Sequence, residues 1–282
     1  MGGKIIVIGV GTMGCGIAQV ALAAGYDVVL MSHSEQSVKK GLGLLKLNLD
    51  KAVAKARMTA EQENSCMARL KGSWEMNDLK DAYLIVEAVP EDLKTKLDVL
   101  SNIDRYADQS TIIATNTSSI PISSLAVGLR DPSRLIGLHF FNPVPVMKLV
   151  EVVRGAKTSD IALQTARKFG EDVGKTAVDV KDSPGFISNR ILMVYINEAV
   201  KSYQDGVATK EGIDTIAKLG FNHPMGPLEL ADLIGLDVCQ NIMDAIYNET
   251  KNENFIPAPM LKKLVMEGRL GRKTGEGFYK YK

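Results

Sequence analysis

The sequence predicts an α/β protein in which a Rossmann-like, doubly wound sheet domain is followed by an all-helical C-terminal domain. Three observations support this fold class. A glycine-rich turn joins an apolar run directly to a helix near the start of the chain. Apolar runs then alternate with helical segments, as a parallel sheet with helical crossovers requires. After Ser183-Pro184-Gly185 the strand pattern gives way to helical periodicity, and Pro and Gly are the residues that most often interrupt regular structure.

The first elements predict a strand–helix–strand unit. Residues 4–8 (KIIVI) form a short apolar run, typical of a strand buried on both faces. Residues 13–24 predict a helix that ends at Gly25, and residues 27–31 (DVVLM) predict the second strand.

A pair of helices is expected next, inserted at about residues 35–71. Leu42, Leu45 and Leu49 recur there at helical spacing, and lysines crowd the opposite face. Beyond this pair, the sequence predicts strands at 83–87, 111–115, 135–140 and 149–153, a helix near 91–106, and a late edge strand from residue 174.

The domain boundary is expected near residue 184. It divides the 282 residues into a dinucleotide-binding domain over 1–184 and a helical domain over 185–282, and a chain of this length suits two domains. In the second domain, one predicted helix contains Ile191, Leu192, Met193, Val194 and Ile196. A helix that is apolar on so many sides is expected to be buried all round.

The composition argues against several classes of protein. The net charge of +1 gives no global field for nucleic acid or an anionic membrane, and no apolar run approaches the ~20 residues of a membrane-spanning helix. The odd number of cysteines (Cys15, Cys66 and Cys239) argues against a disulfide framework, and their spacing matches no metal site. The first residues lack the features of a signal peptide, so a cytoplasmic protein is expected.

The glycine-rich turn is expected to bind a dinucleotide. Its first glycine makes the tight bend, its second lets pyrophosphate approach the backbone, and its third lets the helix pack close to the strand. The helix N-terminus adds unpaired N–H groups for the phosphates. A glycine turn without a ligand is the alternative, but the strand–turn–helix context favours a nicotinamide cofactor. The turn consists of Gly9, Val10, Gly11, Thr12, Met13 and Gly14.

The end of the second strand departs from the usual NAD pattern. An acidic residue about 20 residues after the glycines normally accepts hydrogen bonds from the adenosine ribose, but Ser32 stands there. Without that carboxylate a 2′-phosphate would not be repelled, and Ser32, His33, Ser34 or Lys39 could meet it. No arginine stands nearby in the sequence to clamp such a phosphate. The residues therefore leave NAD and NADP both open.

A histidine and a glutamate are candidates for proton transfer. Oxidation of a secondary alcohol needs a base for the hydroxyl proton, and histidine is the usual base near neutral pH. His139 lies at the end of a predicted sheet strand, where ligands of open α/β sheets collect. Glu151 lies 12 residues later, on the next strand, where its carboxylate could orient the imidazole. A histidine that only packs in the core is the alternative.

Further motifs stand in one order along nearly the whole chain. They are TNTSS at 115–119, HFFNPVPVMKLVE at 139–151, PGF followed by NR at 184–190, HPMGP at 223–227 and LGRKTGEGFY at 270–279. Together with the glycine turn, they resemble the L-3-hydroxyacyl-CoA dehydrogenase family. The chain is most similar to its short bacterial members, which act on 3-hydroxybutyryl-CoA in butyrate fermentation.

The resemblance implies a reaction and the residues that perform it. The reaction is the interconversion of (S)-3-hydroxybutyryl-CoA and acetoacetyl-CoA by hydride transfer, in a homodimer joined through the C-terminal domain. His139 would be the general base and acid, and Glu151 its partner. Ser118 and Asn189 would contact the substrate oxygen.

The resemblance also implies residues that bind the cofactor and coenzyme A. Asn116 would lie beside the nicotinamide, and Glu91 and Lys96 on the cofactor side. Lys51 and Lys55 match lysines near coenzyme A, lie four residues apart on one helix face, and carry the charge that a phosphate needs. A solvated surface face is the alternative for these two lysines.

Two other functions are open. The first is a dehydrogenase of small free hydroxy acids that uses a lysine base; the pairing of His139 with Glu151 and the lysine-rich helices argue against it. The second is a catalytically silent, dinucleotide-binding structural protein, as in the lens crystallins derived from this family. An intact base and partner disfavour that second function.

Overall fold

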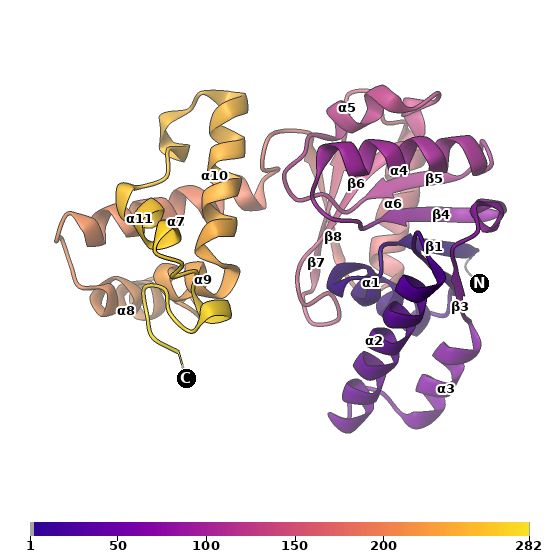
Figure 1. Ribbon diagram of the computed structural model, residues 1–282, viewed down its shortest axis with the longest axis horizontal. Coiled ribbons are helices and arrows are strands. Elements are labelled where there is room, and N and C mark those ends of the chain that lie inside the picture. Colours follow the sequence, from indigo (N-terminus) through magenta and orange to yellow (C-terminus); the bar gives the residue numbers. More distant parts are fainter. Residues whose placement is uncertain (1–2, 282) are drawn as a thin grey trace. The chain divides into compact units, whose positions relative to one another are not determined.

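The computed structural model describes residues 3–281 and divides the chain into two compact units, Met1–Asp182 and Ser183–Lys282. The first unit is built around a mostly parallel sheet, and the second is helical (Figure 1). The predicted fold class is therefore confirmed. The division falls just before the boundary expected from the Ser-Pro-Gly sequence.

The sheet in the described residues has eight strands in the order β3-β2-β1-β4-β5-β6-β7-β8. Only β6 and β7 are antiparallel neighbours; all other adjacent strands run parallel. The order reverses between β1 and β4, and the crevice at such a reversal is where open α/β sheets bind ligands. The strands are β1 (Lys4–Ile8), β2 (Asp27–Met31), β3 (Leu70–Ser73), β4 (Ala82–Glu87), β5 (Ile112–Thr115), β6 (Leu135–Phe140), β7 (Leu149–Arg154) and β8 (Thr176–Lys181).

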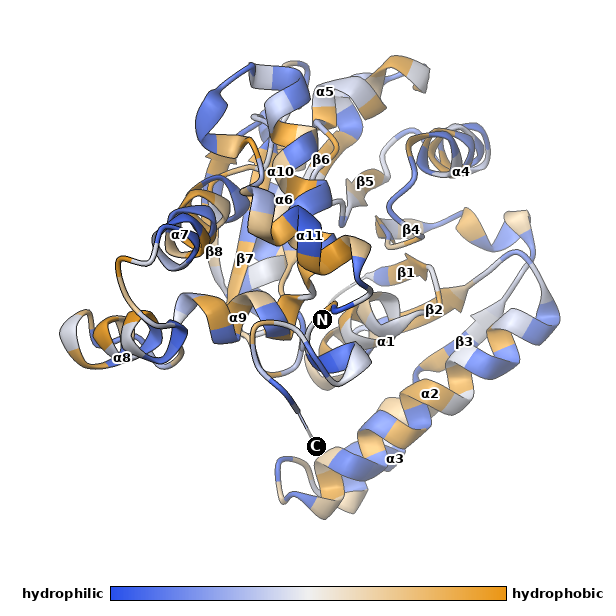
Figure 2. Ribbon diagram, turned by 60° about the vertical axis from the view of Figure 1, so that its left-hand side comes forward, coloured by the Kyte–Doolittle hydropathy of each residue, from blue (hydrophilic) through white to orange (hydrophobic). Residues whose placement is uncertain are grey.

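Helices cover the sheet of the first unit. Apolar residues of α1 and α6 share one core cluster with Ile5 and Val7 of β1. Because successive side chains of a strand point to opposite faces, Ile6 faces the other way, and it is also fully buried. The central strands appear in hydrophobic colours for this reason (Figure 2). The helices are α1 (Thr12–Ala23), α2 (Glu35–Ala54), α3 (Ala60–Ala68), α4 (Leu93–Tyr106), α5 (Ile122–Leu125) and α6 (Asp160–Asp172).

The inserted region differs from its prediction at one end. The two expected helices, α2 and α3, lie side by side (Figure 1), and Leu45 and Leu49 are buried. The helical stretch does not continue to residue 71, because β3 begins at Leu70 and pairs in parallel with β2. The sequence of β3, LKGS, has no apolar alternation. Its strand conformation comes from pairing at the sheet edge, which local periodicity does not report.

The other predicted elements of the first unit are found within two residues of their expected limits. The late strand from residue 174 is β8, and it forms an edge of the sheet as expected. Helix α6, between β7 and β8, is additional to the predicted elements.

The second unit packs its helices around a core of Met193, Ile196, Leu236, Met243 and Phe255, among others. Ile191 of α7 is 64% exposed in the single chain. Burial of this helix on all sides therefore stays a prediction that depends on the expected homodimer. No helix in residues 3–281 is long and apolar enough to cross a membrane. The helices are α7 (Ser188–Gln204), α8 (Lys210–Gly220), α9 (Pro227–Ile234), α10 (Leu236–Thr250) and α11 (Pro259–Met266).

Candidate active site

The candidate site lies along one edge of the sheet. The register of the parallel strands pairs Ile8 with Glu87, and Glu87 with Thr115. The residues that follow β1, β4 and β5 therefore emerge at the same edge, together with the end of β6. The candidate residues collect here because this is the carboxyl edge of the parallel strands.

The glycine turn has the shape that a dinucleotide requires. Gly9 adopts φ +120°, and a Cβ added there would lie 2.3 Å from the carbonyl oxygen of Ala88. A Cβ at Gly14 would lie 1.8 Å from the carbonyl oxygen of Gly9, so the turn and α1 need glycine at both positions. A Cβ at Gly11 would meet no atom within 4 Å. That open space lies at the N-terminus of α1, which begins with Thr12 and Met13, and it fits the pyrophosphate of a dinucleotide.

Ser32 directly follows β2, where the ribose-binding carboxylate was expected. Its backbone N–H donates to the carbonyl oxygen of Ser73 at 3.2 Å, and its hydroxyl lies 3.4 Å from Nδ1 of His33. The Ser34 hydroxyl accepts the N–H of Ser37 and caps α2, and Lys39 forms an ion pair with Glu35 at 2.8 Å. All four side chains considered for a 2′-phosphate thus have a partner within the chain: Ser32 and His33 each other, Ser34 the N–H of Ser37, and Lys39 the carboxylate of Glu35.

The predicted base and its partner are in contact. The antiparallel register of β6 and β7 places His139 directly opposite Glu151, and the imidazole Nδ1 lies 2.8 Å from Oε2 of Glu151. The two side chains are 9% and 1% exposed. Because an ionised carboxylate only accepts hydrogen bonds, we assign Nδ1 as the donor and Nε2 as the nitrogen that can accept a proton. This arrangement suits an oriented general base.

Asn116 links the segment after β5 to the strand that carries the histidine. Its side-chain oxygen accepts the N–H of Phe140 at 2.9 Å, and its backbone N–H donates to the carbonyl oxygen of Glu87 at 2.8 Å. Because the donor at Phe140 identifies the amide oxygen, the amide NH₂ group is directed elsewhere. The amide is thus held in one orientation at the sheet edge.

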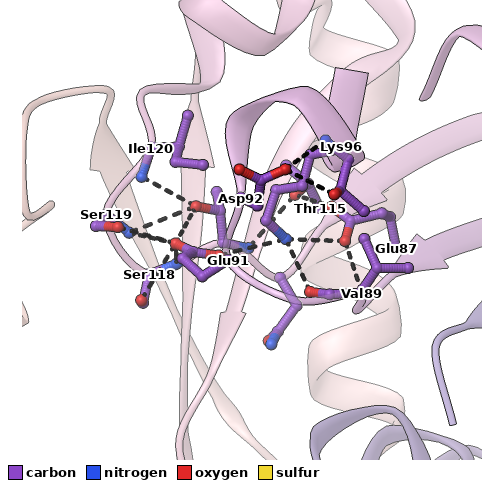
Figure 3. A network of polar contacts seen from close by, with 12 residues as sticks. Glu87, Val89, Glu91, Asp92, Lys96, Thr115, Ser118, Ser119 and Ile120 are labelled. Atoms are coloured by element: carbon purple, nitrogen blue, oxygen red, sulfur yellow. Dashed lines mark hydrogen bonds and ion pairs between the residues drawn. The ribbon is translucent and has the colours of Figure 1, made fainter. Parts of the chain in front are cut away.

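Glu91 gathers the segment that contains Ser118. Its Oε1 accepts hydrogen bonds from the backbone N–H of Ser118 at 2.8 Å and of Ser119 at 3.0 Å (Figure 3). Lys96 lies 1% exposed behind Glu91, with its ammonium 3.3 Å from Oε2 of Glu91 and 2.8 Å from Oε1 of Glu87. The ammonium is thus engaged by two carboxylates, and its direct contact with a cofactor stays a prediction.

Lys51 and Lys55 line a cleft of the first unit. The cleft has a volume of about 740 Å³ and is bounded by α1, α2 and the loop between β6 and β7. Arg57 and Lys148 line the same cleft. Lys175 lines the cleft as well, so five cations and one carboxylate, Asp172, surround it. This excess of positive charge suits an anionic ligand.

Asn189 lies near the start of α7, in the second unit. The structure brings Gly9, Ser118, His139 and Glu151 to one sheet edge. Lys51 and Lys55 line a cleft that Thr12 of the glycine turn and Asn142 of the β6–β7 loop also line. Asn189 belongs to the other unit, so its contact with the substrate oxygen stays a prediction.

Two positions at the site were missed by the sequence analysis. Glu87 ends β4 beneath Lys96, and a carboxylate at the end of the apolar run YLIVE was a signal that could have identified it. Lys175 donates to the carbonyl oxygens of Val144 and Met147 at 2.6 and 2.8 Å and fastens the loop between β6 and β7. Burial lowers the pKa of Lys175. Nothing in the local sequence marks that lysine.

Two family models match the chain. The model described as "3-hydroxyacyl-CoA dehydrogenase, NAD binding domain" matches residues 4–183. The model described as "3-hydroxyacyl-CoA dehydrogenase, C-terminal domain" matches residues 185–281. Together they account for nearly the whole chain, in the order of the two structural units.

Individual relatives match over most or nearly all of their length. A protein named 3-hydroxybutyryl-CoA dehydrogenase from Clostridioides difficile is 47% identical, with 99% of each chain covered. The mitochondrial hydroxyacyl-coenzyme A dehydrogenase of Sus scrofa is 44% identical over 99% of this chain and 91% of its own. The solved structure of (S)-3-hydroxybutyryl-CoA dehydrogenase from Ralstonia eutropha has a TM-score of 0.96 at 43% identity, with 99% of each chain covered.

Proposed function

The chain belongs to the 3-hydroxyacyl-CoA dehydrogenase family, and from this premise we propose that it interconverts (S)-3-hydroxybutyryl-CoA and acetoacetyl-CoA with a nicotinamide cofactor. The buried contact between His139 and Glu151 carries the proposal, because a base and its orienting carboxylate stand at the edge where the glycine turn opens. A silent structural protein would not need that pair. A dehydrogenase with a lysine base would not use it.

The chemistry follows from the polarity of these groups. In the oxidative direction, Nε2 of His139 takes the proton of the 3-hydroxyl group while the hydride leaves C3 and the ketone forms. NAD, when bound at the glycine turn, supplies the hydride acceptor. Glu151 stabilises the imidazolium that results. We assign Ser118 and Asn189 to the substrate oxygen, where their hydrogen bonds would hold the alcohol and polarise the ketone.

For the cofactor, we propose that NAD is used and NADP is tolerated. The family model that matches the first domain is an NAD-binding one, and the open space at Gly11 supports the pyrophosphate. Ser32 brings no negative charge to the end of β2. A 2′-phosphate would therefore meet no repulsion from that position. Asn116, Glu91 and Lys96 are proposed on the nicotinamide side.

For the rest of the substrate, we propose that the cleft lined by Lys51 and Lys55 holds the phosphates of coenzyme A. The cations around this cleft support that role, because lysine binds phosphate as a point charge. Free hydroxy acids carry no such phosphates, and they would gain nothing from this cleft.

We further propose a homodimer joined through the C-terminal domain. Ile191 at 64% exposure and Leu219 at 82% leave apolar surface on the second unit of the single chain, and such surface supports an interface. Light scattering at micromolar concentration should give twice the chain mass, and a monomer would refute the dimer.

The free thiols of the three cysteines support a reducing, cytoplasmic setting.

A steady-state assay tests the function directly. Reduction of acetoacetyl-CoA is followed at the nicotinamide absorbance band, with NADH and with NADPH in parallel. We expect turnover with NADH and measurable turnover with NADPH. Acetoacetate without coenzyme A is the control substrate and should be reduced far more slowly. Equal rates on both substrates would favour the dehydrogenase of free hydroxy acids, and no reduction of either would support a silent protein.

A further inference from the structure

A carboxylate that none of the proposed roles uses lies buried beneath the Ser118 segment. Glu87 ends β4, and its side chain is 0% exposed. Its Oε2 accepts the hydroxyl of Thr115 at 2.6 Å, and its Oε1 accepts the N–H of Val89 at 2.7 Å and the ammonium of Lys96 at 2.8 Å. A buried charge is tolerated when it is both paired and hydrogen-bonded. Glu87 meets both conditions.

Lys96 connects Glu87 to a second carboxylate. It lies near the start of α4, and its ammonium also contacts the carbonyl oxygen of Val89 and Oε2 of Glu91, each at 3.3 Å (Figure 3). The three donors of the ammonium are thus matched by three acceptors. The position of Glu91 is therefore fixed from the buried side of the sheet edge.

The other oxygen of Glu91 collects donors from three consecutive residues. Besides the N–H groups of Ser118 and Ser119, Oε1 accepts the hydroxyls of Thr117 at 2.6 Å, Ser119 at 3.0 Å and Ser118 at 3.3 Å, the last of which would turn to the substrate when it binds. Successive N–H groups aimed at one oxygen form an anion-binding concavity and restrain the backbone. Burial opposes ionisation of Glu91, but the charge of Lys96 and these hydrogen bonds outweigh it and hold its pKa below the ordinary value.

The location of the three charges favours a role in positioning over one in stability alone. A buried ion pair is often no more stabilising than well-packed apolar residues, and the rest of β4 is built from such residues. Glu87, Lys96 and Glu91 instead stand at the carboxyl edge, where ligands bind. Thr115 at one end of the segment is fastened to Glu87, and residues 117–119 at the other end are fastened to Glu91.

We propose that Glu87 is a positioning residue for the reaction. Through Lys96 and Glu91, it holds residues 117–119 in the conformation that presents Ser118 to the substrate oxygen. The inference rests on the proposed function, which assigns that contact to Ser118. It requires that the charge of Glu87, and not only its volume, sets the turnover rate.

The first test removes the charge and keeps the volume. In Glu87→Gln, kcat for acetoacetyl-CoA should fall roughly 10- to 100-fold, the loss that a displacement of about 1 Å produces, while KM for NADH changes less. Thr111→Val is the matched control, because it removes another buried hydrogen bond of the sheet, from the Thr111 hydroxyl to the carbonyl oxygen of Ala82 at 2.8 Å. Its turnover per folded molecule should equal that of the wild type. If Glu87→Gln behaves like the control, the proposal is overturned.

A double-mutant cycle asks whether Glu87 acts through Ser118. Ser118→Ala is introduced into the wild type and into Glu87→Gln. If the serine is already displaced in Glu87→Gln, its removal should cost much less in that background, because residues that act as one unit are not additive. Full additivity of the two losses in kcat would mean that Glu87 does not act through Ser118.

Hydrogen exchange provides a readout that needs no substrate. The peptide that contains residues 117–120 should exchange about tenfold faster in Glu87→Gln, because the opening of a restrained segment becomes easier, and it should be unchanged in Thr111→Val. Unchanged exchange in Glu87→Gln overturns the inference. If the wild type fails to reduce acetoacetyl-CoA, the proposed function fails, while this measurement still decides whether Glu87 holds the segment.

Discussion

The His139–Glu151 pair and the lysine face of α2 represent two ways of building a functional site. His139 and Glu151 are buried and directly opposed on neighbouring strands, so the sheet register sets their distance. Lys51 in the last turn of α2 and Lys55, the C-cap residue that follows it, are exposed and line a cleft. A buried hydrogen bond is fixed in geometry, whereas an exposed charge is screened and mobile. We therefore expect a substitution in the buried pair to lower kcat strongly. Substitutions of the exposed lysines should weaken substrate binding only modestly.

The largest effect is expected at the buried pair. His139→Gln should lower kcat roughly 10²–10⁴-fold, the usual contribution of a general base, while the dissociation constant of NADH from fluorescence titration stays the same. The reason is that the base acts on the substrate and not on the dinucleotide. His223→Gln, in the second unit, is the control and should retain turnover. A His139→Gln enzyme with most of its kcat would remove His139 from the mechanism.

Lys175 combines features of both regions, because it is a lysine that is buried. Lys175→Met leaves the carbonyl oxygens of Val144 and Met147 without their donor, and each lost hydrogen bond should lower the free energy of unfolding by about 0.5–1.5 kcal/mol. Urea denaturation at neutral pH measures this loss.

The same variant has a defined pH dependence. Burial lowers the pKa of Lys175 in the folded state below its ordinary value of 10.5. Between the lowered pKa and 10.5, the unfolded chain binds more protons, so the free energy of unfolding of the wild type gains from this group as pH rises. The advantage of the wild type over Lys175→Met should therefore grow from neutral pH towards 10.5. A shrinking advantage would show that burial does not dominate at this lysine.

A smaller effect is expected at the exposed C-terminal end of α2. Lys51→Ala combined with Lys55→Ala should raise KM for acetoacetyl-CoA roughly 2- to 30-fold, as screened surface charges allow, and should leave a truncated substrate without the nucleotide unaffected. The control variant combines Lys262→Ala with Lys263→Ala. It removes the same charge from two lysines that do not line the cleft, and its KM for acetoacetyl-CoA should be unchanged. Equal losses on the full and truncated substrates would indicate that Lys51 and Lys55 act through folding.

The smallest effect concerns cofactor choice at Ser32. A serine hydroxyl replaces at most one of the two ribose bonds of a carboxylate, a difference of about 0.5–1.5 kcal/mol. Ser32→Asp should therefore lower KM for NADH and raise it for NADPH, shifting the ratio of kcat/KM roughly 2- to 12-fold towards NADH. Ser101→Asp, exposed on α4, adds the same charge elsewhere. If Ser32→Asp changes the ratio of kcat/KM no more than Ser101→Asp does, Ser32 does not face the ribose.

Seven of the eight strands in the described residues, the glycine turn and the two residues of the proton-transfer pair can be recognised in the amino-acid sequence alone. Apolar runs report burial on both faces, so β1, β2 and β6 have the limits that their residues predict. Gly14 is required by its close approach to the carbonyl oxygen of Gly9 within one local turn, and Gly9 by its φ of +120°. Apolar runs and tight turns depend on residues that are close together in the chain. They can therefore be predicted from a short stretch of sequence.

Contacts between residues that are distant in the sequence depend on the tertiary structure. Residues 70–73 form the strand β3 because they pair with the edge of β2. The distance between His139 and Glu151 follows from the register of β6 against β7. Lys96 is buried between Glu87 and Glu91. Lys175 donates to the carbonyl oxygens of Val144 and Met147, which are 31 and 28 residues away in the sequence. Periodicity reports which face of an element is buried, but not what covers that face. A buried ionisable group takes its pKa and its role from those covering residues.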